Sequence, residues 1–166
     1  QVVPPDQIGI SAQITVVSCF EGSDGIIDLS IAGGSAGYSF MWTNSDFVLS
    51  VGSEDLVNFS ADTYIVEVTD SMGCTNSTSY ILEEPEELIL ELDVHNVSCF
   101  GANDGYIDAW VSEGNDGGYT YEWSTGEVLS TVINNLAPGE YFISVADTKG
   151  CFVNDTAIII EPDLIA

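Results

Sequence analysis

Short runs of alternating apolar and polar residues fill most of the chain. In runs such as Ile27–Ile31 and Tyr64–Val68, every second side chain is apolar. A period of two places successive side chains on opposite faces of an extended strand, so each run predicts a half-buried β-strand. No segment of similar length has helical spacing. Glycine-rich breaks at residues 33–37 and 114–118 supply the positive φ angles that turns need.

The same order of blocks occurs twice along the chain. The segment Val17–Phe20 (VSCF) returns 80 residues later as Val97–Phe100, and Asp70–Cys74 (DSMGC) is matched by Asp147–Cys151 (DTKGC). Differences in length fall between the matched blocks, which is where surface loops tolerate insertions. The chain is therefore expected to hold two copies of one structural unit.

The copies set the expected domain boundaries. We assign residues 1–84 to a first domain and residues 85–162 to a second. Residues 1–4 resemble the tail of a preceding copy, and residues 163–166 are either the start of a following copy or a linker. Two interpretations of these ends stay open. The chain is a window from a longer array, or it is a subunit whose ends imitate such junctions when subunits stack head to tail.

Each copy predicts about six or seven strands with turns every ~8–12 residues, a pattern typical of a two-sheet sandwich. We therefore predict an all-β chain of two tandem immunoglobulin-like β-sandwich domains. The second copy carries Leu136–Tyr141 (LAPGEY), which has the form of a turn leading into a strand with a corner tyrosine. The first copy keeps only Phe59 and Tyr64 of this block. Trp42 and Trp123 stand where such modules place a core tryptophan, so we interpret both as packing residues.

These blocks, taken in order, resemble the SprB repeat. The string is Cys-x4-Asp-Gly-x-Ile, a glycine-rich turn, Tyr-x-[Phe/Tyr]-x-Trp, and Leu-x2-Gly-x-Tyr-x3-Val-x-Asp-x2-Gly-Cys before a closing Glu-Pro. The second copy matches from Pro85 to Pro162, whereas the first departs at Asp62, where the pattern has glycine, and carries extra residues at 53–56. The family occurs in gliding-motility adhesins and other secreted surface proteins of Bacteroidota. The resemblance implies a repetitive, adhesive or spacer-like cell-surface protein with no catalytic residues to carry over.

Charge narrows the classes of partner. The chain has 27 acidic residues and one basic residue, Lys149, which gives a formal net charge of -26. Nucleic acids and anionic lipids bind to clusters of Lys and Arg, so we expect neither a nucleic-acid partner nor direct membrane insertion. Ca²⁺ and a saline medium remain as counterparts of so much carboxylate. We favour the simpler interpretation that the carboxylates keep an exposed protein soluble.

The four cysteines lie at equivalent positions, two in each copy, and predict a repeated disulfide in an extracellular compartment. We favour pairing within each copy, Cys19 with Cys74 and Cys99 with Cys151, because the pair recurs as a unit. Immunoglobulin strand order argues for caution, since it places Cys19 and Cys74 at opposite ends of a sandwich. The alternative is a bond between copies, from Cys19 to Cys151, which would join an array into a stiff rod.

Two sets of carboxylates are candidate Ca²⁺ ligands. If the cysteines pair within copies, Asp24 with Asp70, or Asp104 with Asp147, could share one ion. We favour the alternative that Asp before Gly closes a turn through its own backbone.

The second set lies in the linker, where Glu84, Glu86 and Glu87 would bind Ca²⁺ and stiffen the joint. A solvated acidic linker is the interpretation that we favour there. No cofactor is required, and Ca²⁺ is the metal that these residues would accept.

The sequence does not favour an enzyme, because the only histidine, His95, and the only lysine, Lys149, each lack a counterpart in the other copy. The leading hypothesis is a structural repeat of an extracellular fibre, filament or adhesin stalk whose partner is itself, head to tail. The alternative is a Ca²⁺-dependent module that binds carbohydrate, with surface polysaccharide as its partner. Trp110 is its ligand-binding candidate, because its counterpart is Ser30 and it is expected to face outward.

Overall fold

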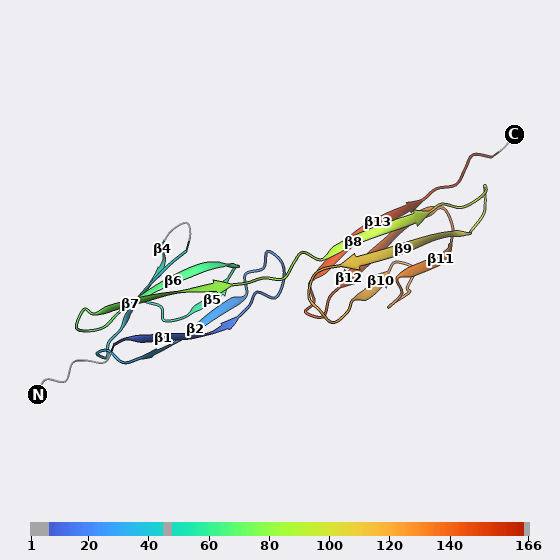
Figure 1. Ribbon diagram of the computed structural model, residues 1–166. Coiled ribbons are helices and arrows are strands. Elements are labelled where there is room, and N and C mark those ends of the chain that lie inside the picture. Colours follow the sequence, from blue (N-terminus) through green and yellow to red (C-terminus); the bar gives the residue numbers. More distant parts are fainter. Residues whose placement is uncertain (1–6, 45–47, 165–166) are drawn as a thin grey trace, which may run out of the picture. The chain divides into compact units, whose positions relative to one another are not determined.

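The computed structural model describes residues 7–44 and 48–164, and in these residues every regular element is a β-strand (Figure 1). The chain divides into two compact units, Gln1–Glu84 and Pro85–Ala166. Their boundary lies at the junction between the two sequence copies. Residues 1–4, whose sequence resembles the tail of a preceding copy, lie outside the described residues, and so do residues 165–166 of the closing segment.

The first unit is a sandwich of two antiparallel sheets. One sheet has the order β1-β2-β5 and the other the order β4-β3-β6-β7. In the constant-type immunoglobulin arrangement the fourth strand pairs within the first sheet, whereas here β4 pairs with β3. The strands are β1 Gly9–Thr15, β2 Gly25–Ala32, β3 Ser39–Thr43, β4 Val48–Val51, β5 Leu56–Phe59, β6 Asp62–Thr69 and β7 Thr75–Leu82.

The second unit repeats this plan with six strands. Its sheets have the orders β11-β9-β8 and β10-β12-β13. The counterpart of β4 is reduced to one isolated bridge between Glu122 and Val128. The strands are β8 Ile89–His95, β9 Gly105–Ser112, β10 Thr120–Trp123, β11 Val132–Leu136, β12 Gly139–Ala146 and β13 Phe152–Ile159. The predicted fold, two tandem immunoglobulin-like β-sandwiches of six or seven strands, is confirmed.

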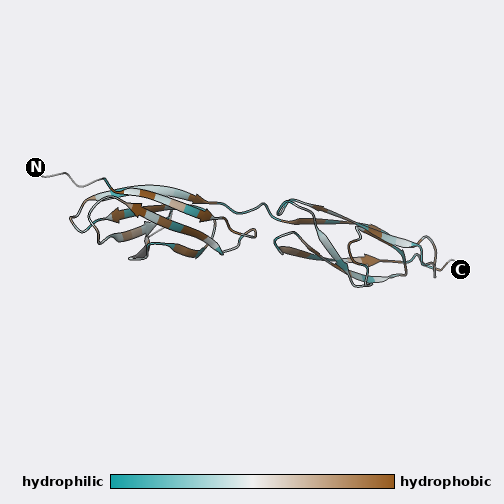
Figure 2. Cartoon of the chain, turned by 90° about the horizontal axis from the view of Figure 1, so that it is seen from below, coloured by the Kyte–Doolittle hydropathy of each residue, from teal (hydrophilic) through white to brown (hydrophobic). Residues whose placement is uncertain are grey.

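Each unit buries a core of its own between its two sheets. Apolar and polar residues alternate along the strands, as the colouring of Figure 2 shows. Trp42 and Trp123 lie in these cores with 0% and 2% of their surface exposed, so the prediction that they are packing residues is confirmed. A buried indole N–H needs an acceptor. Trp42 donates to the carbonyls of Ser53 and Glu54 at 3.2 Å, and Trp123 donates to the carbonyl of Ser130 at 2.8 Å.

Both units have a tyrosine corner. The Tyr64 hydroxyl donates to the carbonyl of Ser60 at 2.8 Å, and the Tyr141 hydroxyl donates to the carbonyl of Ala137 at 2.9 Å. The first unit forms this bond although Asp62 replaces the glycine of the pattern. A Cβ at the equivalent Gly139 would come no closer than 3.8 Å to its neighbours, so the position accepts a side chain.

Candidate functional site

The two ends of each unit carry its cysteines. We call the end where the chain enters a unit the leading end and the end where it leaves the trailing end. At the trailing end of the first unit, the Cys19 turn lies beside the last residues of the unit, because the Val17 N–H donates to the carbonyl of Glu83 at 2.9 Å (Figure 1). At the leading end, the Cys74 turn lies beside the start of β1, because the Asn76 side chain donates to the carbonyl of Ile8 at 2.7 Å.

The same arrangement holds in the second unit. The Ile160 N–H donates to the Asn96 side chain at 2.9 Å, which places the turn that begins at Cys99 at the trailing end. Cys151 follows the turn between β12 and β13, at the leading end. Each unit therefore has one trailing-end cysteine, Cys19 or Cys99, and one leading-end cysteine, Cys74 or Cys151.

Cysteine pairing differs from the expectation that we favoured. Cys19 and Cys151 are disulfide-bonded, whereas Cys74 and Cys99 are free thiols exposed to solvent. Neither within-copy pair forms, so that prediction was wrong. The reason is geometric: the seven residues of β1 separate the two ends of the first unit by about 23 Å. A disulfide requires Cα atoms within about 7 Å.

Asp70 and Asp147 hold the leading-end turns in shape. Asp70 is 5% exposed and accepts hydrogen bonds from the backbone N–H groups of Ser35 at 2.9 Å, Met72 at 2.9 Å and Cys74 at 2.8 Å. These bonds lower the pKa of Asp70, and the bond from Ser35 contributes most. The carboxylate therefore fixes the backbone on both sides of the cysteine and ties it to the loop after β2.

Asp147 has the same role in the second unit. It is 6% exposed and accepts from the Asn115 side chain at 2.8 Å and from the N–H groups of Lys149 at 2.9 Å and Cys151 at 3.0 Å. Burial alone would raise the pKa of Asp147, but the bonds from Asn115, Lys149 and Cys151 outweigh it and lower the pKa. Both oxygens of this carboxylate are therefore committed to the turn and its neighbouring loop.

Asp24 and Asp104 shape the opposite, trailing-end turns. The Ser18 N–H donates to Asp24 at 2.9 Å, and the Ser98 N–H donates to Asp104 at 2.9 Å. Hydrogen bonds from Ser18, first from its side chain and then from its backbone, lower the pKa of Asp24. Bonds from Ser98 do the same for Asp104. The interpretation of these residues as turn-closing carboxylates fits this geometry.

The structure does not bring the proposed ion-sharing pairs together. Asp24 precedes β2 and Asp70 is bonded to Ser35 beyond its other end, so the eight residues of β2 lie between them, about 26 Å. Asp104 and Asp147 are separated in the same way by β9. A Ca²⁺ ion shared by either pair is therefore ruled out by strand length. Among residues 7–44 and 48–164, no group of three His, Cys, Asp or Glu side chains could hold a metal.

The acidic linker has a structural role that the sequence did not indicate. Glu84 accepts a hydrogen bond from the Glu21 N–H at 2.7 Å, and Glu161 accepts one from the Gly101 N–H at 3.0 Å. Each carboxylate thus fixes the turn that follows a trailing-end cysteine. The glutamate that precedes proline at the close of each copy was the available signal. The interpretation of Glu86 and Glu87 as part of a solvated linker stays a prediction.

The outward face of β9 carries aromatic and acidic side chains. Trp110 is 67% exposed, as expected from its alternation with buried Ala109. On the same face the Tyr106 ring stacks on His95 with centroids 3.9 Å apart and planes 9° apart. His95 Nε2 lies 3.1 Å from Asp93 Oδ2. The corresponding positions in the first unit are Ile26, Thr15, Gln13 and Ser30, so only the second unit has this face.

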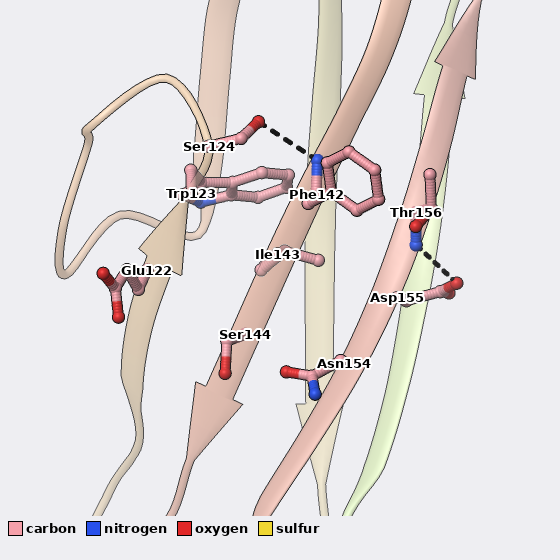
Figure 3. Close-up of a pocket in the computed structure, with 9 residues that line it drawn as sticks. All are labelled: Glu122, Trp123, Ser124, Phe142, Ile143, Ser144, Asn154, Asp155 and Thr156. Atoms are coloured by element: carbon pink, nitrogen blue, oxygen red, sulfur yellow. Dashed lines mark hydrogen bonds between the residues drawn. The ribbon is translucent and has the colours of Figure 1, made fainter.

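A shallow hollow lies on the other sheet of the second unit, formed by β10, β12 and β13 (Figure 3). Its polar groups are partly engaged with backbone: the Phe142 N–H donates to Ser124 Oγ at 3.1 Å, and the Thr156 N–H donates to Asp155 at 2.7 Å. The carboxylates of Glu122 and Asp155 point away from each other in this view. The lining residues contain no histidine, cysteine or lysine.

A family model described as the SprB repeat matches residues 11–47 and residues 92–128. No curated protein matches the chain. In the part of the chain that is described, no helix is long and apolar enough to cross a membrane.

Several solved structures resemble the chain at low identity. A C-terminal 282-residue fragment of intimin, in complex with the intimin-binding domain of the translocated intimin receptor, is 12% identical with a TM-score of 0.45; the match covers 95% of this chain and 64% of the fragment. The N-terminal eight Ig domains of DSCAM isoform 1.30.30 are 12% identical with a TM-score of 0.45, covering 94% and 25%. Murine CEACAM1b is 10% identical with a TM-score of 0.35, covering 93% and 100%. At these scores the similarity carries no functional argument.

Proposed function

Because the chain carries two SprB repeats, we propose that it is a structural module of an extracellular fibre or adhesin stalk in which repeats are linked head to tail. The observation that carries this proposal is the state of the cysteines. Two of the four are bonded and two are free, and the bonded ones, Cys19 and Cys151, belong to different repeats. Part of this proposal is that a trailing-end cysteine bonds to the leading-end cysteine of the neighbouring repeat, so that the disulfide links consecutive repeats.

The positions of these cysteines suit such a link. Cys19 stands at the trailing end of the first repeat, held by the hydrogen bonds of Val17 and Glu84. Cys151 stands at the leading end of the second repeat, held by Asp147. In the proposed arrangement, a bond from trailing end to leading end would join the same two repeats as the peptide linker between Leu82 and Ile89. Tension on the chain would then pass through a covalent bond as well as through the linker.

Charge and redox state support the proposed setting. A structural disulfide persists in an oxidising compartment, which supports a setting outside the cytosol, at the cell surface or in a secreted fibre. A formal net charge of -26 on each chain keeps neighbouring fibres apart and the surface hydrated.

Small-angle scattering of the full chain with and without reductant tests this function. We expect an elongated particle under oxidising conditions and a broader distribution of lengths after reduction, because the linker then hinges freely. The variant Cys19→Ser/Cys151→Ser should behave like the reduced protein. The matched control Cys74→Ser/Cys99→Ser leaves the bonded pair in place and should behave like the oxidised protein. A compact particle in the oxidised state would contradict the proposal.

A second candidate function is recognition of carbohydrate by the face of Tyr106 and Trp110. Exposed aromatic rings beside carboxylates suit stacking on a sugar ring and hydrogen bonding to its hydroxyl groups. The specific observation is that this face occurs in one repeat alone, although the cores of the two repeats are equivalent.

A glycan array probed with the full chain, with and without a Ca²⁺ chelator, tests whether this face binds carbohydrate and whether the binding requires Ca²⁺. Trp110→Ala should abolish binding, while Phe152→Ala, which removes another exposed ring from the same repeat, should leave it intact. If Trp110→Ala binds as the unaltered chain does, the face is not a sugar site.

A further inference from the structure

The free cysteine at the trailing end, Cys99, has the same backbone setting as the bonded Cys19. The Ala102 N–H donates to the carbonyl of Cys99 at 3.0 Å, as the Gly22 N–H donates to the carbonyl of Cys19 at 2.9 Å. Asp104 accepts from the N–H of the residue before the cysteine, and Glu161 accepts from an N–H within the turn. Asp24 and Glu84 make the equivalent bonds in the first repeat. The turn that presents a bonded sulfur in one repeat therefore presents a free thiol in the other.

The free cysteine at the leading end, Cys74, matches the bonded Cys151 in the same way. The Asp70 N–H donates to the carbonyl of Cys74 at 2.9 Å, and the Asp147 N–H donates to the carbonyl of Cys151 at 2.9 Å. The return bonds, from the cysteine N–H to the aspartate, are 2.8 Å and 3.0 Å. Both leading ends thus hold their cysteine with the same pair of reciprocal bonds.

Apolar surface lies beside each free thiol. Ser98, Cys99 and Phe100 form a hollow with Pro162, Asp163 and Leu164 at the trailing end of the second repeat. Phe100 is 54% exposed and Leu164 is 69% exposed. At the leading end of the first repeat, Met72 is 74% exposed two residues before Cys74. The second repeat has Lys149 at the position of Met72, so the apolar residue belongs to the leading end that carries a free thiol.

We propose that Cys99 and Cys74 are covalent coupling sites: the trailing-end Cys99 forms a disulfide with the leading-end cysteine of a following repeat, whose Met72-type side chain packs on the hollow beside Phe100. This inference rests on the proposed head-to-tail function. The following repeat is supplied by a second copy of this chain or by the same, longer polypeptide, and the thiol chemistry is the same for both.

The bond requires an oxidant. The Sγ–H groups of Cys99 and of the partner cysteine each lose a proton, and one S–S bond forms between them. The two electrons pass to a low-molecular-weight disulfide such as oxidised glutathione, whose own S–S bond breaks to give two thiols. The exchange runs through a mixed disulfide on one of the two exposed cysteines.

Coupling of the purified chain in a glutathione redox buffer tests the proposal on non-reducing gels. The unaltered chain has one coupling site of each kind, so it should form a ladder of linear multimers. Cys74→Ser alone and Cys99→Ser alone should remain monomers. An equimolar mixture of these two variants should give a dimer and nothing larger, joined through Cys99 and Cys74. Multimers should form faster at high ionic strength, because salt screens repulsion between chains of charge -26.

Three results would overturn the proposal. Dimers of each single variant that form as readily as the mixed dimer would mean that exposed thiols oxidise without specific docking. No mixed dimer at any ionic strength would mean that the ends do not meet. Phe100→Ala that leaves the rate of mixed-dimer formation unchanged would remove the packing surface, whereas we expect that rate to fall severalfold.

Failure of the coupling is distinguishable from failure of the proposed function, because scattering of the monomer depends on Cys19 and Cys151 and not on the two free cysteines. The source of the following repeat is read from native material. If a second copy supplies it, reduction should release subunits of the length of this chain. If the same polypeptide supplies it, the mass on a denaturing gel should not change on reduction.

Discussion

The two repeats share their cores and their ends but differ on their outward faces. Both bury a tryptophan on the strand that follows the glycine-rich turn, close a tyrosine corner, and hold each cysteine turn with an aspartate. By contrast, β4 of the first repeat is reduced to a bridge in the second, and the aromatic face of the second has no counterpart in the first. The core and the two ends are therefore common to both repeats, whereas their outward faces differ.

The cores also differ in how closely neighbouring atoms pack around the glycine that begins the second strand of each repeat. A Cβ on Gly25 would lie 2.5 Å from Leu82 Cδ2 and 2.9 Å from the carbonyl of Phe59. A Cβ on the equivalent Gly105 would lie 3.0 Å from Ile159 Cδ1 and 3.1 Å from the carbonyl of Leu136. The first repeat is thus packed more closely at the start of its second strand.

The largest expected effect comes from removing a core tryptophan. Trp42→Ala should lower the free energy of unfolding of the first repeat by about 3–5 kcal/mol, and Trp123→Ala should do the same for the second. Because the cores are separate, each change should leave the midpoint of the other repeat unaltered. Denaturant unfolding in reductant, followed by circular dichroism and by the remaining tryptophan fluorescence, measures both. A shift of both midpoints by one substitution would show that the cores are not independent.

Substituting alanine for each of these two glycines should destabilise the two repeats by different amounts. Gly25→Ala should destabilise the first repeat by about 1–3 kcal/mol, because Leu82 and the fixed carbonyl of Phe59 must move. Gly105→Ala should destabilise the second repeat by less, because its contacts are longer. The same unfolding assay gives both values, and equal losses would contradict the difference in packing.

The tyrosine corners offer a smaller contrast. Tyr64→Phe leaves the carbonyl of Ser60 without its donor next to a ring that is 2% exposed, and should destabilise the first repeat by about 1–2 kcal/mol. The Tyr141 hydroxyl is accessible to water, which can replace it on Ala137, so Tyr141→Phe should have an effect under about 1 kcal/mol. A larger loss of stability for Tyr141→Phe than for Tyr64→Phe would contradict this difference.

The smallest expected effect is on how steeply the free energy of unfolding falls as the pH is lowered. The lowered pKa of Asp70 and Asp147 means that the folded protein binds these protons less tightly than the unfolded chain, in which the ordinary value is 3.8. Their stabilisation is therefore complete above that value and is lost as the pH falls through it toward the folded pKa. Asp147→Asn should flatten this loss for the second repeat alone. An unchanged acid slope would show that the carboxylate does not stabilise its turn.

The fold was predictable from the sequence, whereas the spacing of the cysteines did not show that Cys74 and Cys99 would be free thiols. Period-two alternation and the Trp and Tyr blocks are local signals, and they identify the strands and core of each repeat. Whether Cys19 meets Cys74 depends on which end of the sandwich each turn occupies, which follows from strand order and not from spacing. The outward face of Trp110 followed from alternation, but the stacking of Tyr106 on His95 needed the register between β8 and β9.

Mapping the disulfides tests the central claim, that consecutive repeats are joined end to end, most directly. The free thiols are alkylated first, and the unreduced chain is then digested with a protease that cuts at acidic residues, because the chain has a single basic residue for trypsin. Mass spectrometry should find the Cys19 and Cys151 peptides linked, with Cys74 and Cys99 alkylated. A peptide that links Cys19 to Cys74, or Cys99 to Cys151, would contradict the account.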